Sequence, residues 1–254
     1  MNHVQFTKFE SAVRSYAGDP CDQSLLMASD GPLEVYYSPF EWVNEGAKLV
    51  LVGITPGRVQ AANALAEAKR QLIGGADASQ ALKSAKETGA FSGPMRKNLV
   101  AMLDHIGVPS WLGVESSAVL FDGKQASLLQ TASVLQFPVF LKGGNYNGTP
   151  DILTTPLLRQ MLLDNFAAMA RTLSGAAFVP LGPVPLKALR WLASSGQINA
   201  SRILEGLPHP SPANVERVNY FLELKDRKDL SSKTDPLKLD AARSSLRQAV
   251  VELV

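Results

Sequence analysis

The sequence has little of several features that mark common classes of protein. Cys21 is its only cysteine, which excludes intramolecular disulfides, four-cysteine zinc sites and four-cysteine iron–sulfur clusters. Its longest apolar runs, such as residues 49–54, are far shorter than the roughly 20 residues that span a membrane. The amino terminus has no basic segment followed by an apolar one, so we expect no signal peptide and a cytoplasmic location.

The chain also lacks three motifs that would indicate a familiar chemistry. It contains no Gly-x-Gly-x-x-Gly dinucleotide signature, no Gly-Lys-Ser/Thr ending of a P-loop and no Gly-x-Ser-x-Gly nucleophile elbow. The formal net charge of +2 is weak evidence for a polyanionic partner. Residues 58–100 hold seven basic and three acidic side chains, and this excess of +4 fits either a phosphate-binding face or a solvated helix surface.

What the sequence does contain is an alternation of strand-like and helix-like segments. Short apolar runs predict strands, and longer stretches carry apolar residues at the three- and four-residue spacing of helices. The alternation predicts an α/β fold, a three-layer α/β/α sandwich with a short central parallel four-stranded sheet. Of the one or two domains that 254 residues allow, we expect one. The predicted strands are residues 49–54, 134–141, 176–181 and 203–207, and the clearest helical stretches are 99–106, 158–173 and 239–250.

Ligands of parallel sheets bind outside the carboxyl ends of the strands, which directs attention to residues 53–57, 142–148, 182–183 and 209–214. The first of these segments ends a strand and leads into a helix. Its glycines let backbone approach a ligand, and the helix N-terminus offers free N–H groups to an anion. The last segment holds His209, one of only three histidines, between prolines that fix the local backbone.

Taken together, these segments resemble the uracil-DNA glycosylase superfamily. A Gly-x-x-Pro-Gly turn at 53–57 is paired with a His-Pro-Ser-x-x-Asn turn at 209–214. Residues 89–94, Gly-Ala-Phe-Ser-Gly-Pro, and the helix after them are similar to the Pro-Phe-x-Gly segment of the iron–sulfur glycosylases. The resemblance covers residues 49–222, and its motif layout is closest to the iron–sulfur and single-strand-selective branches, without the cluster cysteines.

The resemblance implies removal of uracil from DNA by base flipping and hydrolysis of the N-glycosidic bond, without a metal or other cofactor. It implies a single domain over residues 1–254, with helical extensions at about 1–45 and about 225–254. The implied partner is DNA that contains uracil or abasic sites, bound by a monomer that joins the nucleoid when it acts.

The resemblance also implies roles for individual residues. His209 would stabilise the departing pyrimidine anion, and Phe91 would stack on the flipped base. Asn145 would read the Watson–Crick edge of uracil, with Asn147 and Gln136 as alternatives. The base pocket would also be lined by Gly53, Ile54, Pro56 and Gly57. The DNA side would be formed by Pro210, Ser211 and Asn214.

The sequence departs from the family pattern at Thr55, which would lie at the attacking water. The active branches carry Asp, Asn or Glu at this position, whereas threonine cannot accept a proton at neutral pH. Two other functions therefore stay open. One is a catalytically weak protein that binds damaged or abasic DNA. The other is a small-molecule α/β enzyme with an anion bound at the Gly57 turn.

Overall fold

The computed structural model describes residues 4–88 and 93–253, which form two compact units. The first unit comprises residues 4–43, 54–88 and 133–169. The second comprises residues 44–53, 93–132 and 170–253. The chain therefore passes between the units several times, and one of these passages lies between Gly53 and Ile54 in the first candidate turn.

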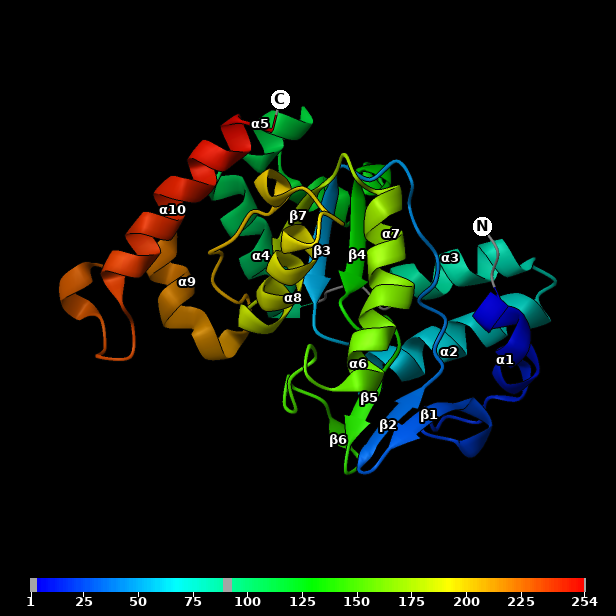
Figure 1. Cartoon of the computed structure of the whole chain (residues 1–254). Coiled ribbons are helices and arrows are strands. Elements are labelled where there is room, and N and C mark those ends of the chain that lie inside the picture. Colours follow the sequence, from blue (N-terminus) through cyan, green and yellow to red (C-terminus); the bar gives the residue numbers. More distant parts are fainter. Residues whose placement is uncertain (1–3, 89–92, 254) are drawn as a thin grey trace. The chain divides into compact units, whose positions relative to one another are not determined.

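The first unit contains an antiparallel sheet of four short strands in the order β1-β2-β5-β6, coloured blue and green in Figure 1. Gly31 has a φ of +56° and turns the chain between β1 and β2, a conformation that glycine adopts without strain. Leu33 and Val35 are buried and pair with the β5 residues Leu141 and Val139. The strands are β1 (Leu26–Asp30), β2 (Leu33–Tyr36), β5 (Val139–Leu141) and β6 (Gly144–Asn145).

Helices α2 and α3 of the first unit pack on each other through small side chains. Ala64 and Ala68 of α2 and Ala81 and Ala85 of α3 are fully buried, and alanines at helical spacing let two helix backbones approach closely. The helices of this unit are α1 (Val4–Ser15), α2 (Arg58–Ile73), α3 (Ala78–Thr88) and α6 (Pro156–Met161), followed by a π-helical turn (Leu162–Phe166) and the start of α7 (Ala167–Thr172).

The second unit is built around a parallel sheet of three strands in the order β4-β3-β7, flanked by helices. The strands are β3 (Leu49–Gly53), β4 (Leu129–Ser133) and β7 (Ala177–Pro180). In the register of β3 and β7, Leu49 pairs with Ala177 and Val52 with Pro180. Ile203 adds one parallel bridge to Phe178 on the outer side of β7. The interiors of β3 and β7 are apolar and fully buried, as expected for parallel strands covered on both faces, whereas β4 also contains polar side chains.

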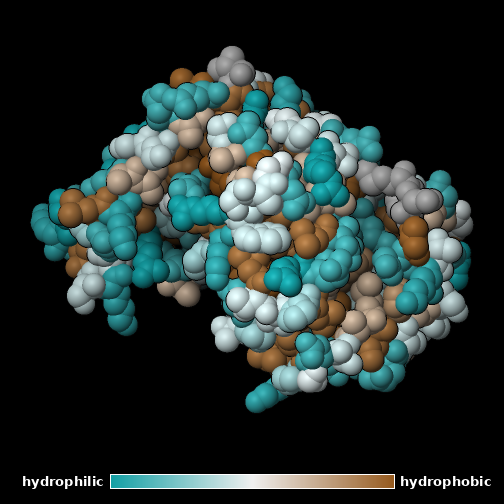
Figure 2. Space-filling view, viewed as in Figure 1, coloured by the Kyte–Doolittle hydropathy of each residue, from teal (hydrophilic) through white to brown (hydrophobic). Residues whose placement is uncertain are grey.

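Helix α10 packs into the core of the second unit through Leu246 and Val250, which are nearly inaccessible to solvent. Asp235 caps its N-terminus by accepting a hydrogen bond from the Lys238 N–H, with Pro236 in the first turn. The side of α10 that faces the viewer in Figure 2 is mostly hydrophilic. The helices of this unit are α4 (Gly93–His105), α5 (Val108–Leu112), α8 (Pro183–Ser194), α9 (Val215–Phe221) and α10 (Pro236–Val251), with the end of α7.

The predicted α/β class is confirmed, and three details of the prediction are wrong. The parallel sheet has three strands, because of the fourth predicted strand only Ile203 pairs with β7, through one isolated bridge. The apolar run 134–141 is not a strand of this sheet. Its second half is β5 of the antiparallel sheet, and residues 129–133 form the parallel strand β4 instead. The segment 1–45 is not only helical, because it contains the β1–β2 hairpin.

Pro138 explains why the apolar run divides. It has no N–H for a sheet ladder, and its carbonyl oxygen accepts a hydrogen bond from the Tyr36 N–H, which directs the chain to β2. The expectation of a single domain stays a prediction. Of the helices in the described ranges, none is long and apolar enough to cross a membrane.

Candidate functional site

The carboxyl edge of the parallel sheet carries a histidine. Strand β3 ends at Gly53, and on the adjacent strand the Leu181 N–H donates to the Val52 carbonyl, so Gly182 follows at the same edge. The His209 ring lies against Gly182, where a Cβ atom would stand 3.6 Å from the ring Cδ2. Gly182 has φ +107° and ψ 178°, a conformation restricted almost entirely to glycine.

The imidazole of His209 has a defined tautomer. The Ser211 N–H donates to its Nδ1 atom at 3.2 Å. Since a backbone N–H can only donate, Nδ1 carries no proton in this arrangement and the neutral ring carries its proton on Nε2. The ring is half-buried, and burial lowers the pKa of His209 from its ordinary value. At neutral pH the side chain is therefore an uncharged hydrogen-bond donor.

The turn that carries His209 is fastened by side chains from two helices. Asn98 of α4 donates from Nδ2 to the Pro210 carbonyl at 2.9 Å, across 112 residues of sequence. Asn214 donates from Nδ2 to the Ser211 hydroxyl at 3.1 Å. Arg217 of α9 donates to the Asn214 amide oxygen at 3.1 Å. A continuous series of hydrogen bonds thus runs from Arg217 through Asn214 and Ser211 to the ring of His209.

A second hydrogen-bond cluster holds the segment before α10 onto α9. Arg217 also donates to the Lys233 carbonyl at 2.9 Å. Glu216 accepts from Ser231, Thr234 and Lys225, and these bonds hold the pKa of its carboxyl well below the ordinary range. The base of the histidine turn is therefore connected to the segment around residues 225–234.

The residues expected on the DNA side differ in exposure. Pro210 is buried, and its carbonyl is taken by Asn98, so the structure gives it a role in holding the turn. Ser211 and Asn214 are half-buried and bonded to each other. Pro212 and Ala213 are exposed and form the tip of the turn.

In the first unit, the Gly57 turn and Asn145 are brought together. The Arg58 N–H donates to the Asn145 side-chain oxygen at 3.0 Å, and a Cβ on Gly57 would lie 3.5 Å from the Asn145 Nδ2. The Gly57 N–H donates to the Gln60 side chain at 3.0 Å. The Arg58 guanidinium donates to the Gly143 carbonyl at 2.9 Å. Asn145 is exposed, and its Nδ2 group points to the glycine turn.

This arrangement bears on an anion at the Gly57 turn. The two N–H groups of Gly57 and Arg58, which begin helix α2, already have acceptors within the protein. An anion there would have to displace the Gln60 and Asn145 side chains. The first turn of α2 therefore offers an anion fewer donors than the sequence suggests.

The Thr55 hydroxyl is occupied by backbone groups of the first unit. It donates to the Phe137 carbonyl at 3.0 Å and accepts from the Val139 N–H at 3.1 Å. Pro56 beside it is buried, and Ile54 accepts a backbone hydrogen bond from the Leu135 N–H. Thr55 thus connects the glycine turn to the chain that enters β5.

Three further residues are expected at the site. Phe91 lies outside the described residues. Gln136 is half-buried and Asn147 is exposed. Among residues 4–88 and 93–253, no three His, Cys, Asp or Glu side chains come together as ligands for a metal ion. The sequence did not indicate Asn98. Gly182 lies in one of the four strand-end segments that the sequence indicates, but nothing in the sequence shows that the His209 ring packs against it.

The fold and the site define a helix-rich α/β protein that holds a neutral histidine at the carboxyl edge of a small parallel sheet. No family model matches the chain, and no solved structure matches it. The chain is 36% identical over 201 residues to the protein described as "Uncharacterized protein YoxB" of Bacillus subtilis (strain 168), and the match covers 78% of each chain. The chain belongs to the same family as YoxB.

Proposed function

We propose that the protein is a monofunctional DNA glycosylase that removes uracil from DNA. The observation that carries this proposal is the Ser211 N–H bond to His209 Nδ1, which leaves a half-buried neutral imidazole with its proton on Nε2. Such a donor suits a reaction in which negative charge develops on a leaving group. The resemblance of the turns at 53–57 and 209–214 to the uracil-DNA glycosylases supports the same assignment.

In the proposed reaction the C1′–N1 bond breaks and its electron pair departs with the pyrimidine. The sugar becomes cationic, and negative charge collects on the pyrimidine oxygens. The Nε2–H of His209 donates to the O2 atom of that anion, a stabilisation worth on the order of 10²–10³ in rate. Water then adds to C1′, and the proton that it loses neutralises the uracil anion, which leaves an abasic sugar and free uracil.

Asn145 is the residue that we propose to read the base. Its Nδ2 group can donate to the O4 atom of uracil, and its oxygen, which already accepts from Arg58, keeps one lone pair for the N3–H. The Arg58 bond fixes the orientation of the amide, so Nδ2 cannot exchange places with the oxygen without losing that bond.

The exposed tip formed by Pro212 and Ala213 is the proposed wedge in the minor groove. Small and apolar side chains of this kind enter base steps and hold a duplex open. Ser211 keeps its hydroxyl proton for a DNA phosphate, since the hydroxyl oxygen accepts from Asn214.

One observation favours a second candidate, a protein that binds damaged or abasic DNA with little turnover. The Thr55 hydroxyl is bonded to Phe137 and Val139, so it donates its proton to a carbonyl and has no basic group to activate water. General-base assistance contributes about 10²–10⁴ in rate, and a site without it cuts slowly.

A single excision assay separates the two candidates. The full chain is incubated with a duplex that carries one deoxyuridine, and abasic sites are then cleaved with alkali. We expect strand scission that falls on the order of 10²-fold in His209→Ala and stays unchanged in the control His105→Gln. Retention of abasic DNA without scission would assign the binding function. The absence of both strand scission and lesion-dependent retention would refute both candidates.

A further inference from the structure

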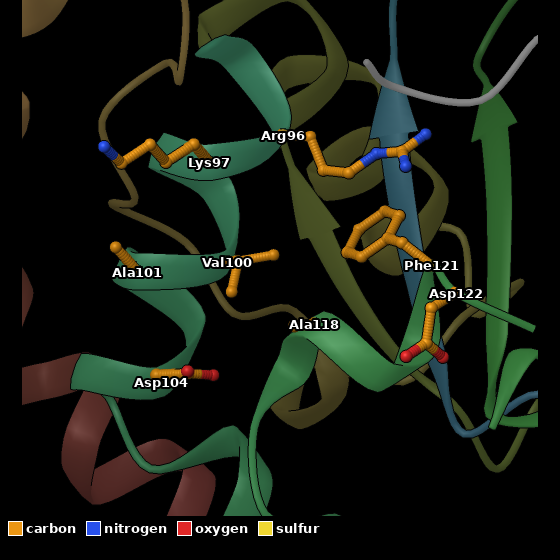
Figure 3. A pocket seen from close by; sticks show the side chains of 8 residues that line it. All are labelled: Arg96, Lys97, Val100, Ala101, Asp104, Ala118, Phe121 and Asp122. Carbon is orange, nitrogen blue, oxygen red and sulfur yellow. The ribbon is translucent and has the colours of Figure 1, made fainter. Parts of the chain in front are cut away.

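A hollow lies in the second unit, between helix α4 and residues 117–122. Its cavity of about 600 Å³ is within the range of pockets that hold small ligands. Figure 3 shows the side chains around it. Its lining includes Arg96, Lys97, Val100, Ala118, Phe121 and Asp122.

The walls of this α4 pocket suit a flat apolar group. Val100 of α4 points toward the ring of Phe121, and Ala118 lies below them (Figure 3). The guanidinium of Arg96 lies over the Phe121 ring, 5.4 Å from its centroid. Aromatic rings and guanidinium planes are the surfaces on which nucleobases stack.

Charge is distributed unevenly around the pocket. Arg96 and Lys97 lie in the turn of α4 near its amino-terminal end, with their charged groups pointing in opposite directions, while Asp104 and Asp122 lie at the other end of the pocket (Figure 3). The Asp104 carboxylate is fixed, because it accepts from the Ser116 hydroxyl and from a backbone N–H, both at 2.7 Å. A complementary ligand carries an anion at one end, a planar middle and hydrogen-bond donors at the other end.

We propose that the α4 pocket binds a nucleoside monophosphate unit. Its phosphate lies over the turn of α4 that carries Arg96 and Lys97, its base lies between Val100 and Phe121, and N–H groups of the base donate to the Asp122 carboxylate. Guanine offers an N1–H and an N2 amino group on one edge, which match the two oxygens of a carboxylate. Thymine offers only one N–H there, so guanine is the preferred base.

The unit can come from a free nucleotide or from an unstacked nucleotide of a DNA strand. Helix α4 also supplies Asn98, which binds the Pro210 carbonyl next to His209. The pocket and the histidine turn are therefore attached to the same turn of one helix. The inference does not depend on glycosylase activity, and its test uses no uracil.

The test is isothermal titration of the full chain with dGMP, dTMP and deoxyguanosine. We expect dGMP to bind more tightly than dTMP or the nucleoside without phosphate. Lys97→Gln should weaken dGMP about two- to fivefold, as for an exposed charge, while the control Lys238→Gln, also exposed, leaves it unchanged. Asp122→Asn should reduce the preference for dGMP over dTMP by about threefold or more.

A further variant and a longer probe complete the test. Phe121→Leu keeps an apolar side chain but removes the stacking face, and we expect about a tenfold loss of dGMP affinity with a small change in melting temperature. Tighter binding of the trinucleotide pTpGpT than of dGMP assigns the pocket to DNA, and weaker binding assigns it to a free nucleotide. No binding of either probe, or binding unchanged in Lys97→Gln and Phe121→Leu, overturns the proposal. Binding without uracil excision would refute only the glycosylase function.

Discussion

Gly206 lies where the chain leaves the parallel sheet toward His209, and its replacement by alanine tests the packing of α10. Its φ of +108° is unfavourable for any residue with a Cβ, at a cost of about 1–3 kcal/mol. A Cβ there would also stand 2.9 Å from the Ala242 Cβ, closer than two carbons can approach, and relieving such overpacking costs about 1–3 kcal/mol. We therefore expect Gly206→Ala to lower the free energy of unfolding by about 2–6 kcal/mol.

A double-mutant cycle separates the steric contribution from the backbone contribution. Ala242→Gly alone should destabilise the protein by about 0.5–1 kcal/mol, the usual cost of glycine within a helix. In Gly206→Ala/Ala242→Gly the close approach is gone while the backbone cost stays. The double variant should then be more stable than the sum of the single changes predicts, by about 1–3 kcal/mol.

Guanidinium denaturation of the four proteins measures this coupling. Equal slopes with shifted midpoints would show that only stability has changed. Additive effects, within about 0.5 kcal/mol, would refute the reasoning. The backbone conformation alone would then explain why position 206 is a glycine. In that case Ala242 of α10 would not contact the segment that leads to the His209 turn.

Three further predictions concern buried or hydrogen-bonded charges. Burial lowers the pKa of Lys86 to about 8, so between pH 8 and 10.5 the unfolded state binds more protons than the folded state, and the free energy of unfolding rises with pH by about 3 kcal/mol. Guanidinium denaturation across this range should show the rise in the unchanged protein and not in Lys86→Met. Hydrogen bonds from Ser231 and its neighbours lower the pKa of Glu216, so their stabilisation is present above pH 4.5 and is lost as the pH falls below it; thermal melts of Glu216→Gln should lose less stability on acidification. Arg217→Gln should accelerate hydrogen exchange of the Ser211 amide with little change in melting temperature, and equal exchange rates would contradict the series of bonds described above.

The strands that the sequence predicts correctly are those whose burial is complete. Residues 49–53 and 177–180 are apolar throughout, because a parallel strand covered on both faces has no polar side. Strand β4 was missed since it contains Gln130, which is nearly inaccessible to solvent. The Gln130 side chain accepts from the Asn44 N–H at 2.8 Å, a contact across 86 residues that no local pattern encodes. A hydrogen bond between residues so far apart in the sequence cannot be predicted from the spacing of apolar residues.

The run 134–141 shows the opposite error. It is apolar enough for a central strand, yet only residues 139–141 form a strand. Pro138 interrupts any strand pairing, and the Thr55 hydroxyl is hydrogen-bonded to the backbone of Phe137 and Val139. Thr55 appeared from the sequence as a weak substitute for a carboxylate at the water. The structure shows a second reason for a hydroxyl there, since an aspartate could accept from the Val139 N–H but could not donate to the Phe137 carbonyl.

The candidate site also contains residues that the sequence could place and residues that it could not. The strand-end rule places His209 at the carboxyl edge of the sheet, where the structure has it, because the rule depends only on the order of strands and turns. Asn98 and Arg217, which fasten the turn, were beyond reach from the sequence. Both act through contacts that exist only after α4 and α9 have packed.

The fastening of the turn bears directly on how a site without a general base could work. A donor stabilises developing charge most when it does not have to reorient during the reaction. The Ser211 bond fixes the His209 tautomer, Gly182 admits the ring, and Asn98 and Arg217 hold the backbone on either side. Folding thus fixes the position of the donor that the proposed reaction needs. Within the proposed function, His209 then lowers the barrier to departure of the base, and water attack on the sugar cation, unaided by Thr55, follows bond cleavage.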